Sequence, residues 1–372
     1  MTSDVRYRLK PGTIIETLPD GVLLFSESSQ EIHRLNDSGA ALMSHLTDGA
    51  TSAQLEAALE SAGVDCGRAS AWTASMLQDV ARLRLLEAEL PPRQSPPVTQ
   101  QISLAGLKIE LRYASRQLFC LLAAGYRHLE SPGAVDLAYE IVDGDKFVLI
   151  AKSGQAADVV ERELAGVWLK GAILEAVLEQ APYVAALHSA CLVGTEGAVL
   201  LLGSPGSGKT ILTMALMQHG YRYGSDDVTL VTSGGDVFGL ALAPGIKESA
   251  WEIAGRLGQD LSQAPVHLRP DGQKVRFAPF TDALAGPGRV STVLHLRRST
   301  GCSPSLSPIG ATAALAEILR EARSPDGRCS AEVIRILSDI VRNARCFELH
   351  YADAQEAAQL ISAGGNRLPD AD

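Results

Sequence analysis

The chain has 372 residues, which is enough for more than one domain, since domains usually have about 100 to 200 residues. It carries 43 acidic and 33 basic residues, and the resulting net charge of -10 argues against binding to nucleic acid or to an anionic membrane. The amino-terminal stretch lacks the apolar core of a secretory signal, and no run of about 20 apolar residues could span a bilayer. We therefore expect a cytoplasmic protein whose partners are small molecules or other proteins.

Residues 1–90 have the pattern of a small separate domain. Three short apolar or alternating runs, "GTIIETL", "GVLLFS" and "QEIHRL", are separated by turn sequences and predict three strands. Three helices are expected next: one capped by Asn36, one capped by Thr51 with Gln54 completing a capping box, and one over 69–87. This order predicts a winged-helix-like α+β domain.

Residues 91–101 contain several prolines and no apolar periodicity, which predicts a stiff, extended linker. The rest of the chain, 102–372, alternates strand-like runs such as "ISLAGLKIELRY" with helical patterns. One long amphipathic helix is expected to run from Val160 through Leu178. Mixed strands and helices around one glycine-rich loop predict an α/β nucleotide-binding domain.

Cysteines give no sign of a metal site, because no CxxC pair or other ligand spacing occurs among them. We expect reduced, individually buried thiols. The six positions are Cys66, Cys120, Cys191, Cys302, Cys329 and Cys346.

The clearest motif is "GSPGSGKT", which fits the Walker A pattern G-x-x-x-x-G-K-[ST] at every fixed position. Residues 203–208 are called the glycine loop below. An apolar strand precedes this loop and an amphipathic helix follows it, which is the context that the motif requires. Such loops hold phosphates with backbone N–H groups, while the lysine contacts the β and γ oxygens and the hydroxyl binds Mg²⁺. A plain glycine-rich turn is the alternative. The predicted nucleotide-binding residues are Gly203, Ser204, Pro205, Gly206, Ser207, Gly208, Lys209 and Thr210.

A pair of carboxylates, Asp226 and Asp227, follows the helix that leaves the glycine loop. Adjacent carboxylates repel each other, so a magnesium ion is a natural partner for them. One could hold the metal while the other takes a proton from an attacking hydroxyl. The alternative is a solvated acidic turn at the start of a strand.

His188 is the third candidate, in the segment "AALHSACLV" just before the strand that enters the glycine loop. A histidine among small apolar residues is commonly a packed core residue. If its segment pairs antiparallel with that strand, however, His188 would lie near the loop.

Residues 188–231 resemble the core of the HPr kinase/phosphorylase family, whose phosphate-loop fold is related to that of phosphoenolpyruvate carboxykinase. The similarity comprises a histidine, a short hairpin, the Walker A sequence, one helix and a "DD" pair in this order. It implies ATP and Mg²⁺ as cofactors and an assembly of several copies. It also implies Lys209 on the phosphates, Thr210 and Asp227 on magnesium, Asp226 as general base and His188 beside the carboxylates. The family's second signature, a glycine-rich stretch with a glutamate, is not recognisable here.

Residues 11–87 resemble the PqqD family of peptide-recognition domains, through "LPDGVLLFSESSQEIHRLNDSGAALMSHLTDGATSAQLEAAL". The resemblance implies that a leader peptide adds as an extra strand along about 30–35, with the helix at about 69–85 closing the groove. A winged-helix DNA binder is the alternative. The acidic residues beside His33 and Arg34 make a poor electrostatic footprint for that role.

Together the two resemblances predict a kinase that phosphorylates a hydroxyl, most plausibly of serine, on a ribosomally made precursor peptide held by its leader. Similar kinases accompany lasso-peptide gene clusters. Two alternatives are a nucleotide-hydrolysing maturation ATPase or chaperone, and an HPr-type regulatory kinase acting on a folded carrier protein.

Overall fold

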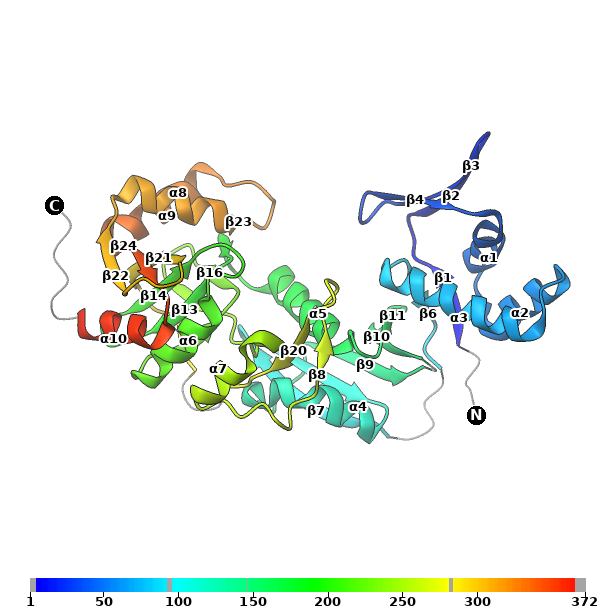
Figure 1. Ribbon diagram of the computed structural model, residues 1–372, viewed down its shortest axis with the longest axis horizontal. Helices are drawn as coiled ribbons and strands as arrows, with labels where there is room; N and C mark the ends of the chain where they lie inside the picture. The colour runs from blue at the N-terminus through cyan, green and yellow to red at the C-terminus, as the bar shows by residue number, and fades with distance from the viewer. Residues whose placement is uncertain (1–4, 92–95, 145, 281–283, 365–372) are drawn as a thin grey trace.

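The computed structural model describes residues 5–91, 96–144, 146–280 and 284–364. These residues form a mixed α/β fold with five sheets and ten α-helices (Figure 1). This confirms the α/β class predicted from the sequence. Part of the predicted linker, 92–95, and the last residues of the predicted second domain, 365–372, lie outside the described residues.

The three strands and three helices predicted near the amino terminus are confirmed. The strands form an antiparallel sheet in the order β2-β3-β4. Asn36 caps α1, and Thr51 and Gln54 form the expected capping box on α2. The bounds are β2 (Thr13–Leu18), β3 (Gly21–Ser26), β4 (Glu31–Leu35), α1 (Asp37–Thr47), α2 (Ser52–Ser61) and α3 (Cys66–Arg82).

The third helix differs from its predicted bounds. Asp65 caps α3, so the helix begins three residues earlier than the apolar pattern indicated. It ends at Arg82 because the chain turns through Arg84, which has a positive φ of 60°, and then forms a strand. The apolar residues after the turn belong to that strand, β6 (Leu86–Ala88).

An eight-stranded sheet joins the amino-terminal segment to the next part of the chain. Its order is β5-β1-β6-β11-β10-β9-β8-β7, and β6 pairs antiparallel with β11. The sheet therefore continues across the predicted boundary between 1–90 and 102–372, and the division into domains remains a prediction. The bounds are β1 (Arg6–Leu9), β5 (Ala50–Thr51), β7 (Val98–Leu104), β8 (Leu107–Tyr113), β9 (Leu137–Asp143), β10 (Phe147–Lys152) and β11 (Ala157–Glu161).

Three predicted segments need correction in this region. The linker is shorter than expected because β7 already begins at Val98. The run "ISLAGLKIELRY" is part of a hairpin whose turn has positive φ at Ala105 and Gly106. Val160 lies in β11, and the long helix α5 (Ala165–Gln180) begins only after it.

A six-stranded sheet carries the glycine loop. Its order is β15-β13-β14-β21-β24-β22, with β14 antiparallel to β13 and parallel to β21. The strand bounds are β13 (Ala190–Val193), β14 (Ala198–Leu202), β15 (Arg222–Ser225), β21 (Val290–Arg298), β22 (Ser305–Pro308) and β24 (Arg345–Tyr351).

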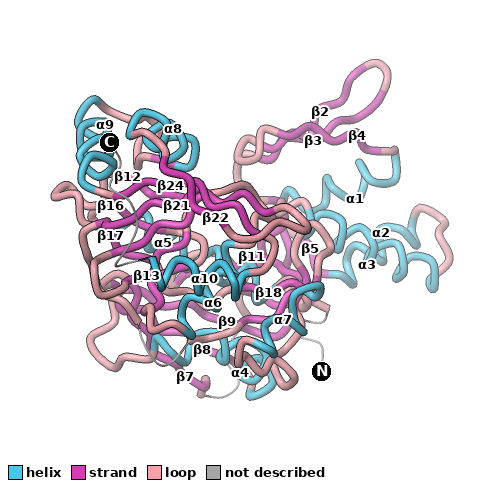
Figure 2. The backbone as a smooth tube through the Cα atoms, turned by 60° about the vertical axis from the view of Figure 1, so that its left-hand side comes forward, coloured by secondary structure: helices cyan, strands magenta, loops and turns pink. Residues whose placement is uncertain are grey.

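Helices pack on both faces of this sheet because the side chains of β14 alternate between them. Leu201 packs into the cluster that contains α6 (Lys209–Gln218) and α10 (Ala354–Gly364). Leu200 packs into the opposite cluster with α8 (Ala311–Glu321) and α9 (Ala331–Asn343). Figure 2 shows α8 and α9 on one side of β21 and β24, and α6 and α10 on the other. Every residue of β14 is buried, as expected for a central strand that is covered on both faces.

The chain passes through two bends between the six-stranded sheet and a four-stranded sheet of order β17-β16-β12-β23. The first bend separates β12 from β13, and the second separates β15 from β16. Because β13 pairs with β15 and β12 pairs with β16, the two bends lie side by side. The bounds are β12 (Ala185–Leu187), β16 (Thr229–Val231), β17 (Val237–Gly239) and β23 (Ala322–Arg323).

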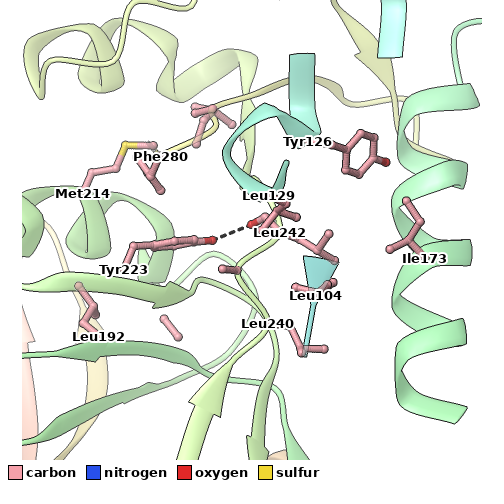
Figure 3. Close-up of a cluster of buried hydrophobic side chains, with 14 of the residues drawn as sticks. Leu104, Tyr126, Leu129, Ile173, Leu192, Met214, Tyr223, Leu240, Leu242 and Phe280 are labelled. Carbon is pink, nitrogen blue, oxygen red and sulfur yellow. Dashed lines mark hydrogen bonds between the residues drawn. The ribbon is translucent and has the colours of Figure 1, made fainter. Parts of the chain in front are cut away.

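The remaining elements pack around α5 and α6. A third small sheet has the order β18-β20-β19. The largest hydrophobic core extends from the eight-stranded sheet to the six-stranded sheet, and in it the Tyr223 hydroxyl donates a 2.8 Å hydrogen bond to the Leu242 carbonyl (Figure 3). The bounds are α4 (Arg116–Leu122), α7 (Trp251–Arg256), β18 (Gly245–Lys247), β19 (His267–Leu268) and β20 (Lys274–Phe277).

The cysteines are free, but the prediction that each is buried is wrong. Cys191 and Cys346 are buried within strands, whereas Cys66, Cys120 and Cys329 are exposed. Among the described helices, none is long and apolar enough to cross a membrane.

We predict that Leu337→Ala will destabilise the fold by about 2 to 5 kcal/mol, because Leu337 lies on the buried face of α9 and its loss leaves a cavity. Chemical denaturation would measure the change. Arg335→Ala, at an exposed position on the same helix, is the control and should change the free energy of unfolding by less than about 0.5 kcal/mol. Equal effects of both variants would contradict the packing assigned to α9.

Candidate functional site

The glycine loop links the end of β14 to the start of α6 and has the backbone that its sequence predicts. Gly206 and Gly208 have positive φ angles of 89° and 93°. A Cβ atom on Gly208 would lie 2.5 Å from the Tyr351 hydroxyl, so a larger residue would displace that ring. The loop therefore needs glycine at this position both for its conformation and for space.

Lys209 begins α6 and is largely buried. Its Nζ donates a 2.5 Å hydrogen bond to the Gly203 carbonyl, and burial lowers the pKa of its ammonium group. The Ser207 Oγ is also buried and has no hydrogen-bond partner in the described structure. A buried cation and an unpaired hydroxyl at a glycine-rich helix start are features that a bound phosphate would satisfy.

Asp226 lies at the bend after β15 and faces α6. Its Oδ2 accepts a 3.0 Å hydrogen bond from the Thr210 hydroxyl, and its Oδ1 accepts a 3.3 Å bond from the Tyr223 hydroxyl. Burial raises the pKa of the Asp226 carboxyl, although the positive charge of Lys170 opposes this effect. A divalent cation at this point would favour the ionised carboxylate.

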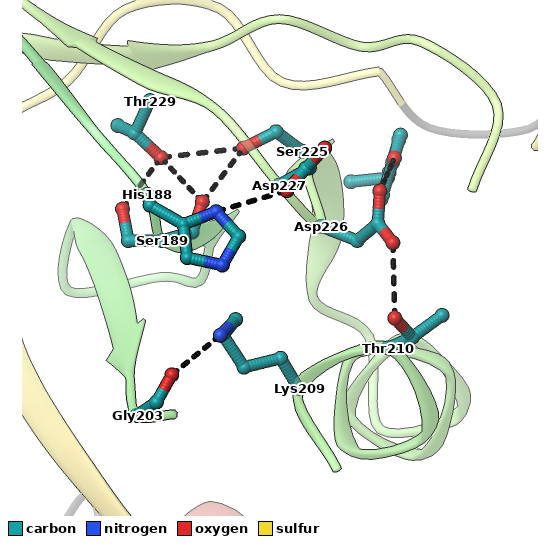
Figure 4. Close-up of polar contacts among 10 residues, drawn as sticks. His188, Ser189, Gly203, Lys209, Thr210, Ser225, Asp226, Asp227 and Thr229 are labelled. Atoms are coloured by element: carbon teal, nitrogen blue, oxygen red, sulfur yellow. Dashed lines mark hydrogen bonds and ion pairs between the residues drawn. The ribbon is translucent and has the colours of Figure 1, made fainter. Parts of the chain in front are cut away.

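Asp227 lies next to Asp226 in the same bend between β15 and β16, and its side chain contacts His188 instead of Thr210. His188 Nδ1 lies 2.9 Å from Asp227 Oδ1, and both side chains are about half exposed. The hydrogen bond with His188 lowers the pKa of Asp227, and the same bond raises the pKa of His188. Figure 4 shows that this pair and Lys209 border the same space.

Buried hydroxyl groups join the two bends that carry His188 and Asp227. Ser189 Oγ donates a 2.9 Å hydrogen bond to Thr229 Oγ1, which in turn donates to the Ser189 carbonyl at 3.1 Å. Ser225 Oγ lies 3.2 Å from the same threonine hydroxyl. These three residues are buried, so the hydrogen bonds hold the bends at a fixed separation (Figure 4).

The structure brings the residues predicted from the motifs together, with one change in their pairing. The antiparallel pairing of β13 with β14 places His188 near the loop, as the sequence predicts. Thr210 donates a hydrogen bond to Asp226. The family resemblance implies that Thr210 and Asp227 share a metal, and that implication stays a prediction. Within the loop, Ser204, Pro205 and Gly206 are exposed, and Ser207 is buried.

Sequence reasoning missed three residues around the site. Lys170 on α5 donates a 3.0 Å hydrogen bond to the Ala243 carbonyl, and its charge lowers the pKa of Asp227. Tyr223 contacts Asp226, and Tyr351 donates a 2.6 Å bond to the Ser207 carbonyl of the glycine loop. Lys170 is the one basic residue of α5 and stands among apolar residues there, which was a usable signal. No sequence signal indicated Tyr351, because it lies 144 residues from its hydrogen-bond partner Ser207.

The donor set suits magnesium better than a soft transition metal. In the described part of the chain, no three His, Cys, Asp or Glu side chains gather closely enough to hold a metal ion by themselves. Mg²⁺ commonly takes only one or two protein oxygens and completes its shell with water and phosphate. The Thr210 hydroxyl and the Asp226 carboxylate fit that requirement.

Comparison with known proteins adds no relative: no protein-family model matches the chain, and no curated protein is significantly similar to it.

Proposed function

We propose that the chain is an ATP-dependent kinase that transfers a phosphoryl group to a serine hydroxyl on a precursor peptide. The observation that carries this proposal is the arrangement of two differently paired carboxylates beyond one glycine loop. Asp226 contacts Thr210 at the start of α6, while Asp227 contacts His188 and faces the solvent side. Nucleotide binding alone does not require the second pair.

The nucleotide side of the site rests on the glycine loop and the positive end of α6. Backbone N–H groups of the loop and Lys209 would bind the β and γ phosphates. Lys209 would then donate its hydrogen bond to phosphate oxygens in place of the Gly203 carbonyl. Thr210 and Asp226 would hold Mg²⁺, which when bound neutralises charge on the phosphates.

We assign Asp227 as the general base for the acceptor hydroxyl. This assignment exchanges the two roles implied by the family resemblance, in which Asp226 is the base. Two contacts favour the exchange: Asp226 is buried against Thr210, whereas Asp227 is half exposed and oriented by His188. Phosphoryl transfer depends mainly on positioning and charge stabilisation, so a fixed carboxylate matters more than a strongly basic one.

In the proposed step, the acceptor hydroxyl oxygen forms a bond to the γ phosphorus while the bond between that phosphorus and the bridging oxygen breaks. Asp227 receives the hydroxyl proton, and the leaving ADP keeps the electron pair of the broken bond. Lys209 stabilises the negative charge that develops on the phosphate oxygens. No oxidant or further reactant is needed.

Features of the three-stranded sheet β2-β3-β4 support the proposal that the substrate is a peptide. Among the described residues, β4 is an edge strand that pairs with β3 alone, and its other edge could accept an added strand. Ile32 on β4 is 69% exposed, and it shares a sheet face with Ile14, which is 50% exposed. On α3, Trp72 is 46% exposed. These apolar side chains suit a leader segment that alternates apolar and polar residues.

Binding of a leader on this sheet would raise the local concentration of the attached acceptor hydroxyl at the kinase site. The direct experiment is to incubate the full chain with Mg²⁺, ATP and a precursor peptide, and to look for the mass of an added phosphoryl group. Release of inorganic phosphate without a modified peptide would contradict the kinase and favour an ATPase.

We predict that Lys209→Ala will lower the rate of peptide phosphorylation by about 100- to 1000-fold, because it removes a cation that stabilises the transferring group. The rate of phosphopeptide formation checks this. Lys274→Ala is a matched control, since Lys274 is exposed and pairs with Glu248 on the surface. An unchanged rate in the Lys209 variant would remove the glycine loop from the reaction.

Asparagine substitutions at the two aspartates should impair different steps, phosphoryl transfer in one case and Mg²⁺–ATP binding in the other. Asp227→Asn should lower the transfer rate by about 100- to 10,000-fold with nearly normal binding of Mg²⁺–ATP, because it removes only the proton acceptor. Asp226→Asn should weaken Mg²⁺–ATP binding itself, since it removes a metal ligand. Calorimetric titration and transfer rates together separate the two. The opposite pattern would restore the roles implied by the family resemblance.

We predict that Ile32→Lys will raise the KM for the full precursor about tenfold and leave kcat unchanged. The reason is that leader contacts stabilise the bound substrate and the transition state equally. Ala57→Lys adds the same charge at an exposed position on α2 and serves as the control. A peptide lacking its leader should respond equally to both variants. If neither variant changes KM for the full precursor, the leader does not bind along β4.

A further inference from the structure

A cavity of about 330 Å³ lies where the amino-terminal segment meets the rest of the chain, and we call it the junction cavity. Lys10, Arg82, Arg84 and Leu86 line it from the amino-terminal side. Residues of β11, of the start of α5 and of the turn between β19 and β20 form the opposite wall. Ligand sites are often found where two parts of a protein meet. In the described structure, the lining includes no residue of the glycine loop.

The walls of the junction cavity are mainly apolar. Val167 and Trp168 of α5 line one wall, and Leu86 and Pro270 contribute to the others. Trp168 is only partly buried, although α5 packs against the largest hydrophobic core. The volume is near the lower end of the range of about 300 to 1,000 Å³ that is usual for ligand sites. Such a space suits one large apolar side chain with its neighbours better than a whole cofactor.

Basic side chains outnumber acidic ones around this cavity. Each lining carboxylate already has a lining cation as its partner, because Asp158 pairs with Lys10 and Glu161 pairs with Arg82. Arg84 is exposed, and its guanidinium has no hydrogen bond or ion pair within the described residues. The chain as a whole has a net charge of -10, so a locally basic cavity is an exception that favours an anionic group.

On the amino-terminal side, α3 connects the junction cavity to the proposed leader surface. Trp72 belongs to that surface, and Arg82 of the same helix lines the cavity. The two residues are about three turns apart, which is about 15 Å along the helix axis. An extended peptide covers that distance with about five residues. A peptide bound along β4 and α3 can therefore reach the cavity with a short further segment.

On the other side, α5 connects the cavity to the candidate phosphoryl-transfer site. Val167 lines the cavity, and Lys170 lies one turn further along the same face of this helix. The hydrogen bond with His188 and then the charge of Lys170 lower the pKa of Asp227. A peptide in the cavity is therefore one helical turn from a lysine whose charge reaches the proposed general base.

We propose that the junction cavity anchors the part of the precursor peptide between the leader and the acceptor serine, through one large apolar side chain beside an acidic residue. The apolar side chain packs against Val167 and Trp168, and the carboxylate pairs with Arg84. Anchoring here shortens the free segment before the serine, which raises the effective concentration of the hydroxyl at the site. This inference rests on the proposed function, because it assigns a further part of the same substrate.

The first measurement is the binding of a defined probe to the full chain by calorimetric titration. The probe is a synthetic heptapeptide with phenylalanine between two aspartates and glycine at the other positions. A version with lysine in place of both aspartates should bind about tenfold more weakly, and Arg84→Glu should remove this preference because it reverses the charge at the cavity. Arg68→Glu makes the same charge change at an exposed position on α3 and should leave the preference intact.

A second variant changes the space instead of the charge. Val167→Trp should weaken binding of the acidic probe about tenfold, because the larger ring fills the cavity. Val167→Ala keeps the cavity open and should weaken the probe much less. The two substitutions change the same position of α5, so a difference between them reports the space in the cavity.

A probe with an acceptor links the cavity to phosphoryl transfer. Joining the acidic probe to a glycine-rich tail that contains one serine should lower the KM for phosphorylation about tenfold relative to the tail alone. Arg84→Glu should abolish that gain, because the anchoring ion pair is lost.

Three results would overturn the proposal: equal binding of the acidic and lysine probes, unchanged binding in both Arg84→Glu and Val167→Trp, or an equal KM for the joined probe and the bare tail. Phenylacetate bound as tightly as the acidic probe would also overturn it, by assigning the cavity to a small anion. Failure of the proposed function itself would appear differently. The acidic probe would then bind with the expected preference, so the chemistry of the cavity would stand, but no serine peptide would be phosphorylated.

Discussion

The position of β14 at the centre of the six-stranded sheet determines the geometry of the whole candidate site. This strand is fully buried and pairs on both edges, antiparallel with β13 and parallel with β21. The first pairing sets where His188 lies relative to the glycine loop, and the second aligns the strand end that carries Arg298 with the same loop. A shift in either register would move these groups away from Lys209, because every residue of slip turns the side chains to the opposite face.

The two carboxylates illustrate how one sequence pair acquires two environments. Asp226 turns inward to Thr210 and Tyr223, where burial raises its pKa, and Asp227 turns outward to His188, which lowers its pKa. Both effects follow from the bend between β15 and β16, which directs neighbouring side chains to opposite sides. Pairs of titratable groups whose environments separate their pKa values are characteristic of sites with distinct acid, base or metal-binding roles. The assignment of the metal to Asp226 and of the proton to Asp227 rests on their contacts, since Asp226 is buried against Thr210 and Asp227 is half exposed beside His188.

The proposed peptide and nucleotide sites use different kinds of surface. On the three-stranded sheet, an open strand edge and exposed apolar residues offer binding without a pocket, which suits an extended chain. The glycine loop instead offers the buried Lys209 and the start of α6, which suit a compact, negatively charged ligand. The eight-stranded sheet connects these regions, since β6 from the amino-terminal segment pairs with β11.

The sequence by itself determined the local features. Asn36 and Thr51 predict their helix starts because capping depends on neighbouring residues, and the Walker A sequence predicts a strand, a loop and a helix around Lys209. Only the tertiary structure decided what depends on distant partners: β6 joins the eight-stranded sheet, Val160 belongs to a strand, Thr210 contacts Asp226, and Tyr351 supports the glycine loop. Sheet pairing and side-chain packing join residues far apart in the chain, and a local pattern carries no information about those partners.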